Sequence, residues 1–408
     1  MSRVNDLMAA LAPEGIKYFE LQELFETRNG YTPAKSNASL WTDGTVPWFR
    51  MEDLRENGGV LNFAIQRIPE IAVKNGRLFP ANSILVATSA TIGEHALVTV
   101  RHLSNQRFTS LALKPKYVDL LDMKFAYYYG FVLDEWCRNN TTTSSFASVD
   151  MSGFKKFRFP VPPLEVQREI VRILDEFTLL ETKLEAELEA RRQQYAFYRE
   201  SLLTSAADEC RQIPMGQLGK FIRGRRFTKA DIVPDGIPSI HYGEIYTHYG
   251  VATSSTISHV REEMADRLCF AEQGDVVIAA VGETVEDVGK AVAWLGHDRV
   301  AIHDDTFLFR GNLNPKFVSY YLQTEEFHSQ KNKYVARAKV KRLAGPSLAK
   351  ILIPVLSLPE QERIVAVLDK FDAFLNDLSV GLPAELTARR KQYEYYRDRL
   401  LTFEEAPA

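Results

Sequence analysis

The chain has 408 residues, a formal net charge of −3, 45% hydrophobic residues and 25% charged residues, a composition typical of globular proteins. This length exceeds what one hydrophobic core usually serves, so two or three domains are expected. No run of eighteen apolar residues occurs, and the N-terminus lacks a signal-peptide pattern, so neither a membrane span nor export is expected. The three cysteines lack zinc-ligand spacing, which predicts no metal site and a reducing, cytoplasmic location.

The first block, residues 1–160, contains short apolar runs interrupted by Gly, Pro and Asn. The run Ile84–Ala87 is bounded by turn-forming residues and is predicted to be a strand. The stretch Phe125–Trp136 is apolar at helical spacing and is predicted to be a helix. The block is therefore predicted to be a mixed α/β unit.

Residues 161–205 follow as one predicted helical segment. Between Ile170 and Leu202, steps of four and three residues alternate, and eight of the ten positions reached are apolar. This seam is typical of helices that pack along their length. The stretch Gln167–Thr204 would extend roughly 57 Å at 1.5 Å per residue.

The second block, residues 206–355, has the same composition of short elements. Val276–Ala280 and Ala291–Leu295 are predicted strands, and Lys316–Phe327 is a predicted helix with Asn314 as its N-cap. Four stretches of the first block have faint counterparts here: 21–33 with 215–227, 46–54 with 237–245, 82–88 with 274–280, and 125–130 with 317–322. The two blocks are therefore predicted to share one scaffold.

The final segment, residues 356–408, repeats the helical segment much more closely. Residues 190–204 (ARRQQYAFYRESLLT) and 388–402 (ARRKQYEYYRDRLLT) are identical at ten of fifteen positions. Residues 159–177 and 353–371 agree at nine of nineteen positions. In this copy the seam changes step between Leu382 and Leu386, beside Gly381 and Pro383, which predicts that one helix ends and another begins there.

The repeat predicts two homologous halves related by a pseudo-twofold axis, with the helical segments forming an antiparallel coiled pair. Part of each seam is expected to be internal core. The repeated stretches also retain polar residues beside the seam, which favours two copies of a face that docks a partner. The residues predicted for these faces are Arg191, Arg192, Gln194, Tyr195, Tyr198, Arg199, Arg389, Arg390, Gln392, Tyr393, Tyr396 and Arg397.

Three stretches that superficially suggest catalysis lack the required pattern. In residues 282–291 (GETVEDVGKA), six residues rather than four separate Gly282 from Gly289-Lys290, and Ala291 replaces the Ser or Thr of a phosphate-binding loop. In residues 314–317 (NPKF), Lys316 replaces the second proline of the Asn-Pro-Pro-(Tyr/Phe) loop of amino-group methyltransferases. The Glu181-Thr182-Lys183 triplet lies in the predicted coiled helix, and no Gly-x-Ser-x-Gly elbow occurs. No catalytic residue is predicted.

Three stretches favour contact with nucleic acid. Residues 223–229 (RGRRFTK) contain four basic residues, and residues 331–342 (KNKYVARAKVKR) contain six and no acidic one. The corresponding place in the first block, residues 138–149, is a run rich in Asn, Thr and Ser. Basic side chains hold phosphates, whereas Asn, Ser, Thr and Arg read base edges. A solvated surface or a flexible loop is the plainer alternative for each stretch.

The helical stretches resemble those of specificity subunits of type I restriction-modification systems, most closely the IC-like subclass. The resemblance covers essentially the whole chain and rests on 162–177 (PPLEVQREIVRILDEF), 358–371 (LPEQERIVAVLDKF) and 381–403 (GLPAELTARRKQYEYYRDRLLTF). It implies an α+β protein with target-recognition domains at 1–160 and 206–355, separated by long antiparallel coiled helices at 161–205 and 356–408.

The resemblance also implies a function without catalysis. Each recognition domain would read one half of a split, asymmetric target in double-stranded DNA, and the helices would dock two methylation subunits and, through them, two motor-nuclease subunits. S-adenosylmethionine, ATP and magnesium would belong to those partners, so no cofactor and no metal is expected on this chain. In IC-like relatives the region matching 184–191 (LEAELEAR) varies in units of four residues and alters the spacer between half-sites.

Contacts to DNA bases are predicted for selected side chains of each block, with Tyr31 and Ser89 as lesser candidates beside glycine-containing turns. In the first block they are Tyr31, Arg50, Arg77, Ser89, Asn105, Gln106 and Arg107. In the second block they are Arg223, Arg225, Arg226, Lys229, His241, Arg337, Lys339, Lys341 and Arg342. The alternatives are a self-sufficient methyltransferase or nuclease, a stand-alone DNA-binding protein, and a coiled-coil adaptor that binds no DNA.

Overall fold

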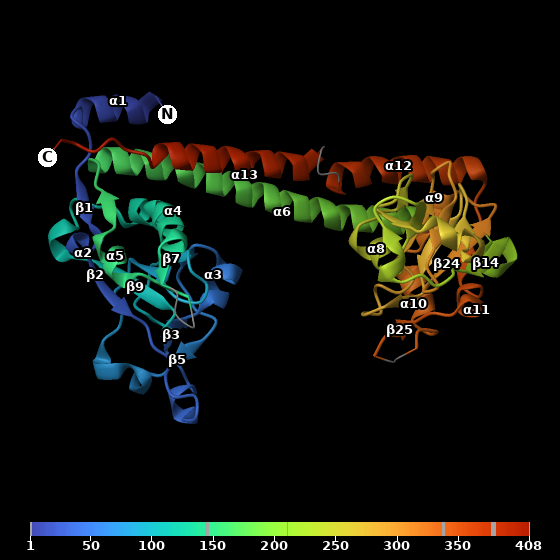
Figure 1. Ribbon diagram of the computed structural model, residues 1–408, viewed down its shortest axis with the longest axis horizontal. Coiled ribbons are helices and arrows are strands. Elements are labelled where there is room, and N and C mark those ends of the chain that lie inside the picture. The colour runs from blue at the N-terminus through green and yellow to red at the C-terminus, as the bar shows by residue number, and fades with distance from the viewer. Residues whose placement is uncertain (1, 143–146, 210, 337–338, 377–380, 408) are drawn as a thin grey trace. The chain divides into compact units, whose positions relative to one another are not determined.

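The computed structural model describes residues 2–142, 147–209, 211–336, 339–376 and 381–407. The chain forms two compact units, the first made of Met1–Lys183 with Thr387–Ala408, the second of Leu184–Leu386. Helix α6 (Leu164–Glu209) contributes its first part to unit 1 and its remainder to unit 2 (Figure 1). No helix among the described residues is long and apolar enough to cross a membrane.

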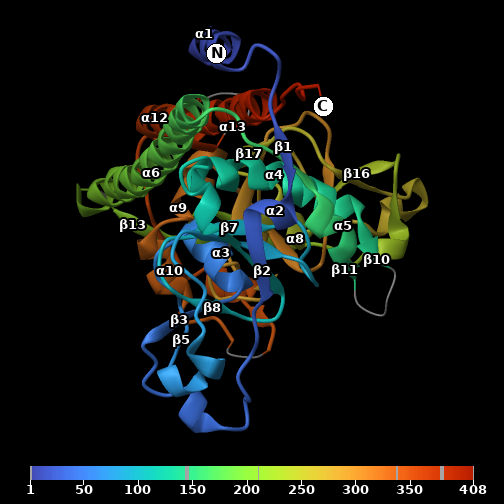
Figure 2. The ribbon, with the colours of Figure 1, turned by 90° about the vertical axis from the view of Figure 1, so that its left-hand side faces the viewer.

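Unit 1 contains one five-stranded sheet, one three-stranded sheet and two strand pairs. The larger sheet has the order β2 (Phe25–Asn29), β9 (Phe108–Leu113), β6 (Ser83–Ala87), β7 (His95–Val98) and β4 (Val60–Leu61). The smaller sheet has the order β5 (Arg67–Ile68), β3 (Val46–Phe49) and β8 (Leu103–Ser104), and lies on the side of the unit remote from α1 (Ser2–Leu11) (Figures 1 and 2). The pairs are β1 (Tyr18–Glu20) with β12 (Arg158–Pro160), and β10 (Thr141–Thr142) with β11 (Ser148–Val149). The helices are α2 (Leu21–Leu24), α3 (Met51–Asn57), α4 (Met123–Asn139) and α5 (Met151–Lys156).

Unit 2 repeats this plan with a larger second sheet. One sheet has the order β14 (Gly219–Arg223), β24 (Thr306–Gly311), β20 (Val276–Ala279), β22 (Ala291–Trp294) and β17 (Ala252–Thr253). The other has the order β15 (Ile232–Val233), β18 (Ser258–Val260), β16 (Ile237–Ile240), β23 (Val300–Ile302) and β19 (Phe270–Ala271). The pairs are β13 (Gln212–Pro214) with β26 (Leu352–Pro354), and β21 (Val281–Gly282) with β25 (Lys341–Arg342). The helices are α7 (Met215–Leu218), α8 (Tyr242–Thr247), α9 (Pro315–Tyr321), α10 (Glu325–Lys331) and α11 (Gly345–Leu348).

The predicted pairing of the helical segments is confirmed within each unit, and the pairing is antiparallel. In unit 1, Phe177 of α6 stacks on Tyr396 of α13 (Gly381–Leu400), and Glu181, further along α6, pairs with Arg390, earlier in α13. In unit 2, Tyr198 of α6 stacks on Phe371 of α12 (Leu358–Asn376). Each unit therefore joins the first part of one helical repeat to the last part of the other.

A buried glutamine fastens each recognition domain to its helix. In unit 1 the Gln167 carboxamide accepts the Asp122 N–H at 2.8 Å and donates to the carbonyls of Leu120 and Pro162. In unit 2 the Gln361 carboxamide accepts the Asn314 N–H at 2.8 Å and donates to the Leu356 carbonyl at 2.9 Å. Both side chains satisfy backbone groups that burial would otherwise leave unpaired, which explains why the sequence repeats this glutamine.

A repeated aspartate makes the second connection. Asp175 accepts from Lys124 Nζ at 2.6 Å and from the Tyr128 hydroxyl at 2.6 Å. Asp369 accepts in the same way from Lys316 Nζ at 2.5 Å and from the Tyr320 hydroxyl at 2.9 Å. Burial, followed in Tyr128 by the aspartate bond, raises the pKa of both tyrosines, so their protons remain available to these bonds.

The structure confirms the predicted strands at β6, β20 and β22, the predicted helix at α4 and the predicted N-cap at Asn314. The single helix predicted for Lys316–Phe327 is wrong, because the chain ends α9 at Tyr321 and starts α10 at Glu325 with Thr324 as its cap. Helix α6 is longer than predicted. The predicted start of a new helix beside Gly381 is confirmed, since α13 begins at Gly381, whose φ of +76° suits a helix boundary; residues 377–380 lie outside the described residues.

Replacing Gln167 by Ala is expected to lower the free energy of unfolding of unit 1 by about 1–3 kcal/mol, because the Asp122 N–H and the carbonyls of Leu120 and Pro162 lose their hydrogen bonds to this buried side chain. Q361A should act less strongly on unit 2, where fewer bonds are lost. Denaturant unfolding would measure both. The control is Q193A at an exposed position of α6, and equal stability of Q167A and Q193A would contradict the role given to Gln167.

Candidate nucleic-acid interface

In unit 1 the candidate site begins where two parallel strands end together. Strands β3 and β8 pair Trp48 with Leu103 and Phe49 with Ser104, so Arg50 and Asn105 follow side by side. The Asn105 N–H donates to the Phe49 carbonyl at 3.1 Å. The ends of β3 and β8 therefore present Arg50 and the segment 105–107 at one edge of the unit.

Four of the residues predicted to contact DNA line one hollow of about 470 Å³ at this edge. The hollow also includes side chains that the sequence did not single out. Trp41 packs edge-on against Trp48, whose indole N–H donates to the Tyr31 carbonyl. The lining residues are Arg50, Asn105, Gln106 and Arg107, which were predicted, and Thr32, Lys35, Trp41, Trp48, Glu52 and Gln66, which were not.

Local hydrogen bonds orient the polar groups of this hollow. The Arg50 N–H donates to the Asp53 carboxylate at 2.7 Å, which caps α3 and places the Arg50 side chain at the helix start. The Asn105 side chain accepts the Arg107 N–H at 3.0 Å, and the Thr32 hydroxyl donates to the Gln106 amide oxygen at 2.5 Å. Arg107 and Gln106 remain exposed, as reading a DNA edge requires.

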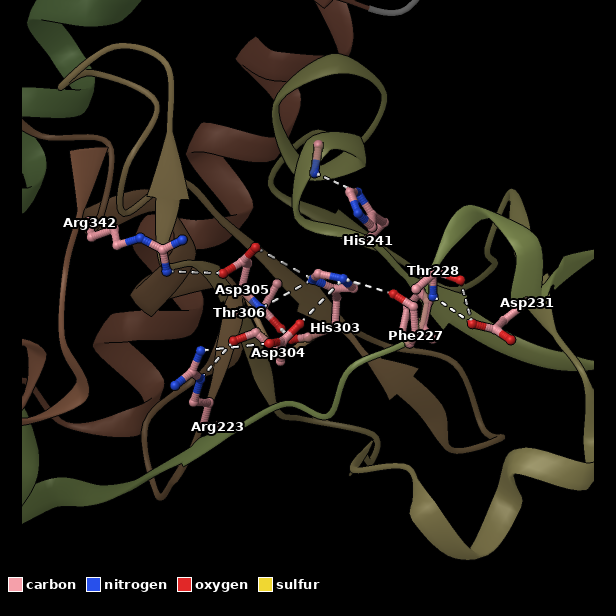
Figure 3. A network of polar contacts seen from close by, with 11 residues as sticks. Arg223, Phe227, Thr228, Asp231, His241, His303, Asp304, Asp305, Thr306 and Arg342 are labelled. Carbon is pink, nitrogen blue, oxygen red and sulfur yellow. Dashed lines mark hydrogen bonds and ion pairs between the residues drawn. The ribbon is translucent and has the colours of Figure 1, made fainter. Parts of the chain in front are cut away.

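Unit 2 has the same edge with different side chains. Strands β16 and β23 pair Ser239 with Ala301 and Ile240 with Ile302, so His241 and His303 follow them. His241 caps α8 as Arg50 caps α3, through the Glu244 carboxylate. The two imidazole rings lie 4.5 Å apart between Arg342 and Thr228 (Figure 3).

Hydrogen bonds assign the tautomer of each histidine at this edge. Burial, and then the neighbouring His303, lower the pKa of His241 to about 4. Its Nδ1 accepts the Gly243 N–H, so the proton lies on Nε2. His303 accepts the Asp305 N–H at Nδ1 and donates from Nε2 to the Phe227 carbonyl.

Two carboxylates distinguish the unit 2 edge from the unit 1 edge. Asp304 pairs with Arg223 at 3.7 Å, and Asp305 pairs with Arg342 at 3.4 Å. Their positions correspond to Gln106 and Arg107, because the Thr88 N–H donates to the Arg107 carbonyl just as the Ala280 N–H donates to the Asp305 carbonyl. His303, Asp304 and Asp305 hold possible metal-ligand atoms within 4.8 Å of one another, but protein groups already bond all three.

The chain immediately after β2 and after β14 passes very close to these edges. A Cβ on Gly30 would lie 2.2 Å from the Asn105 carbonyl oxygen, and one on Gly224 would lie 2.0 Å from that of His303. The next residues, Tyr31 and Arg225, donate their N–H groups to the ends of β8 and β23. Only glycine permits this approach, so residues 31–33 and 225–227 lie against the two edges.

The remaining predicted DNA contacts are more scattered. The Tyr31 hydroxyl is engaged internally, since it donates to the Ala72 carbonyl and accepts the Lys74 N–H. Arg77 is exposed but outside the hollow, and Ser89 bridges to Ser148. Arg225, Arg226 and Lys229 are exposed beside the unit 2 edge, and Lys339, Lys341 and Arg342 lie on or next to β25. Arg337 lies outside the described residues.

The predicted equivalence of 138–149 and 331–342 is visible in the backbone. Ser148 bridges to Ser89 in unit 1, and Arg342 pairs with Val281 in unit 2. The following residues, Val149 and Leu343, donate to the carbonyls of Thr88 and Ala280. The Ser/Thr-rich stretch and the basic stretch therefore occupy one position in the two scaffolds.

The residues predicted to dock a partner divide into internal and exposed groups. Tyr195 is buried against Phe371, and Tyr198 stacks on the same ring. Tyr393 and Tyr396 pack against Phe177. Arg199 donates to Gln323, and Arg397 lies over the Phe131 ring. Arg390 pairs with Glu181. The exposed residues include a repeated pair, in which Arg191 donates to Gln194 and Arg389 donates to Gln392, with Arg192 exposed next to the first pair.

Comparison with known proteins agrees with this architecture. The family model of the type I restriction modification DNA specificity domain matches residues 13–190 and again 212–388, and the chain belongs to this family. The chain is 39% identical over 394 residues to the EcoprrI type I restriction enzyme specificity subunit of Escherichia coli, covering 93% of each. It is 30% identical over 300 residues to the EcoR124I/EcoR124II specificity subunit of Escherichia coli, covering 69% of this chain and 71% of that one. A solved chain from a study of complex assembly and conformational transition of the type I R-M system has the same fold, with a TM-score of 0.63 at 15% identity over 95% of this chain and 98% of that chain.

Replacing Gly224 by Ala is expected to destabilise unit 2 by about 1–3 kcal/mol and to displace the 303–305 segment, because the new methyl group would overlap the His303 carbonyl. Thermal unfolding and near-ultraviolet circular dichroism would measure the change. Gly250 is the matched control, since a Cβ there meets nothing within 4 Å, and G250A should be neutral or slightly stabilising. Equal behaviour of the two variants would contradict the close crossing.

Proposed function

We propose that this chain is the DNA-recognition subunit of a type I restriction-modification complex, with each unit reading one half of a split, asymmetric target. The observation that carries the proposal is the edge that both units build from the same backbone and equip with different polar side chains. Asn105, Gln106 and Arg107 of unit 1 correspond to His303, Asp304 and Asp305 of unit 2, where the two carboxylates pair with Arg223 and Arg342. Because base edges are distinguished by their donors and acceptors, such a change alters the sequence read while preserving the mode of docking.

The chain itself supplies recognition, and partner subunits supply the chemistry. We propose two methylation subunits and, through them, two motor-nuclease subunits, with S-adenosylmethionine, ATP and magnesium bound by those partners, in the cytoplasm where the chromosome lies. The repeated Arg191–Gln194 and Arg389–Gln392 pairs support two equivalent docking faces. The near-neutral charge also suits a reader that partner subunits help to hold on DNA.

Co-expression with a methylation subunit, followed by mass measurement and mapping of methylated adenines on genomic DNA, tests this proposal. The expected result is a complex of two methylation subunits with one chain that marks adenines in a single split motif. A chain that binds neither partner nor DNA would instead support the coiled-coil adaptor. DNA binding without a methylation partner would support the stand-alone DNA-binding protein.

The spacing between half-sites gives a second test, and it depends on assigning the chain to the IC-like subclass. Residues 184–191 (LEAELEAR) almost repeat a tetrapeptide within the continuous helix α6. Four helical residues add about 6 Å, and base pairs stack about 3.4 Å apart. Deleting Leu184–Glu187 is therefore expected to shorten the preferred spacer by one or two base pairs.

Mapping of methylated adenines would measure the spacer of this deletion variant. Both half-site sequences should remain those of the unaltered chain, because the deletion leaves both edges intact. A changed half-site would contradict the proposal that the helix sets only the spacing.

A further inference from the structure

Each unit contains one loop that joins the recognition edge to the central strands. In unit 1 the loop is 88–93, between β6 and β7, and in unit 2 it is 280–289, between β20 and β22. The loop begins between two predicted DNA-contact segments: Thr88 donates to the Arg107 carbonyl and accepts from Val149. In unit 2 the Ala280 N–H donates to the Asp305 carbonyl, and the Ala280 carbonyl accepts from the Leu343 N–H. Any displacement of the loop would therefore displace both neighbouring segments.

Both loops end at a glycine with positive φ, Gly93 at +85° and Gly289 at +91°. The bonds beyond them are also equivalent, since Ala87 donates to the Glu94 carbonyl and Ala279 to the Lys290 carbonyl. The unit 2 loop is the stretch whose sequence superficially suggests a phosphate-binding loop. Thr284 and Asp287 exchange hydrogen bonds in it, and Gly289 serves as the exit of a recognition loop.

A cation near the C-terminal end of a helix holds each loop by its backbone. Arg138, in the last turn of α4, donates from Nη1 to the Gly93 carbonyl at 2.6 Å. Lys331, the last residue of α10, donates from Nζ to the carbonyls of Val288 and of Glu286, the latter at 3.3 Å. A Cβ on Gly93 would lie 2.6 Å from the Arg138 side chain, whereas one on Gly289 would meet the Phe327 ring at 2.9 Å and Lys331 Cδ at 3.3 Å. The cation therefore occupies the space beside the glycine in unit 1, and Phe327 of the same helix shares that space with the cation in unit 2.

Burial of the Lys331 ammonium carries a desolvation cost in free energy. The residue is fully buried, and burial lowers the pKa of its ammonium to about 8. A buried ammonium loses hydration that an apolar side chain of the same length would not require. Its ammonium donates to the loop carbonyls of Glu286 and Val288, so the interaction it provides is a fixed loop backbone.

We propose that Arg138 and Lys331 are positioning residues for DNA recognition, each holding the loop that aligns the two contact segments of its own unit. This inference rests on the proposed function, because it names the residues that determine how accurately each half-site is read. Neither side chain needs to touch a base. Because each cation acts within one unit, loss of one should affect one half-site only.

The test uses the full chain assembled with its methylation subunit, and maps methylated adenines for K331M and R138M. K331M is expected to reduce discrimination against single mismatches in the unit 2 half-site at least tenfold, with the unit 1 half-site and the spacer unchanged. R138M is expected to relax the unit 1 half-site only. The conservative variant K331R should recover most of the discrimination, because it restores a donor to the loop carbonyls.

K333M is the control, since Lys333 is an exposed lysine just beyond the end of α10. A merely structural role would lower the unfolding temperature and the yield of complex without changing relative preference among bases. If K331M fails to assemble, R138M still decides, because Arg138 is exposed and its loss leaves the core of unit 1 intact. Unchanged discrimination by R138M and by any assembled K331M would overturn the inference. If the unaltered chain marks no split motif, the proposed function itself fails.

Discussion

The fold depends on the pairing of the helix that follows each recognition domain with a helix from the other repeat. Phe177 stacks on Tyr396 in unit 1, and Phe371 stacks on Tyr198 in unit 2. The cores of the two units include Ile170 and Leu174 on one side and Ile364 and Leu368 on the other, so these helices belong to the domains they serve. Each unit can complete its helical layer only when a distant part of the chain returns to it. The stretches 190–204 and 388–402 are nearly identical because each packs against the equivalent helix of the other repeat.

The same polar residues recur in both copies of the repeat for two separate physical reasons. Gln167, Asp175 and their counterparts Gln361 and Asp369 bond to the recognition domains and are internal. Their repetition is explained by satisfied backbone groups and requires no partner. The Arg191–Gln194 and Arg389–Gln392 pairs lie on exposed helix surface and repeat the same hydrogen bond, so they are the better support for docking faces.

At the two recognition edges, some positions hold the same residue in both units and others hold different residues. Gly30 and Gly224 are kept because neighbouring carbonyl oxygens occupy the space where a side chain would lie. The residues that follow the parallel strands differ between the units, since Arg50 and Asn105 in one correspond to His241 and His303 in the other, and His303 is buried against Phe227. The loops held by Arg138 and Lys331 lie between these two categories, since their length varies while their attachment does not.

The sequence by itself determined the repeat, the helical seams, the main strands and the equivalence of residues 46–54 with 237–245, because periodicity and spacing are properties of the chain alone. It also singled out Arg50, Asn105, Gln106 and Arg107, which tertiary structure brings into one hollow. It missed Trp41 and Lys35, which come from another segment, and the His303–Asp305 segment, although residues 303–305 follow a strand just as 105–107 do. Only the tertiary structure decided that Tyr195 is buried, that Lys331 is a loop clamp rather than a surface charge, and that each unit takes helices from both repeats. These facts depend on which distant segments meet, and local pattern contains no information about such contacts.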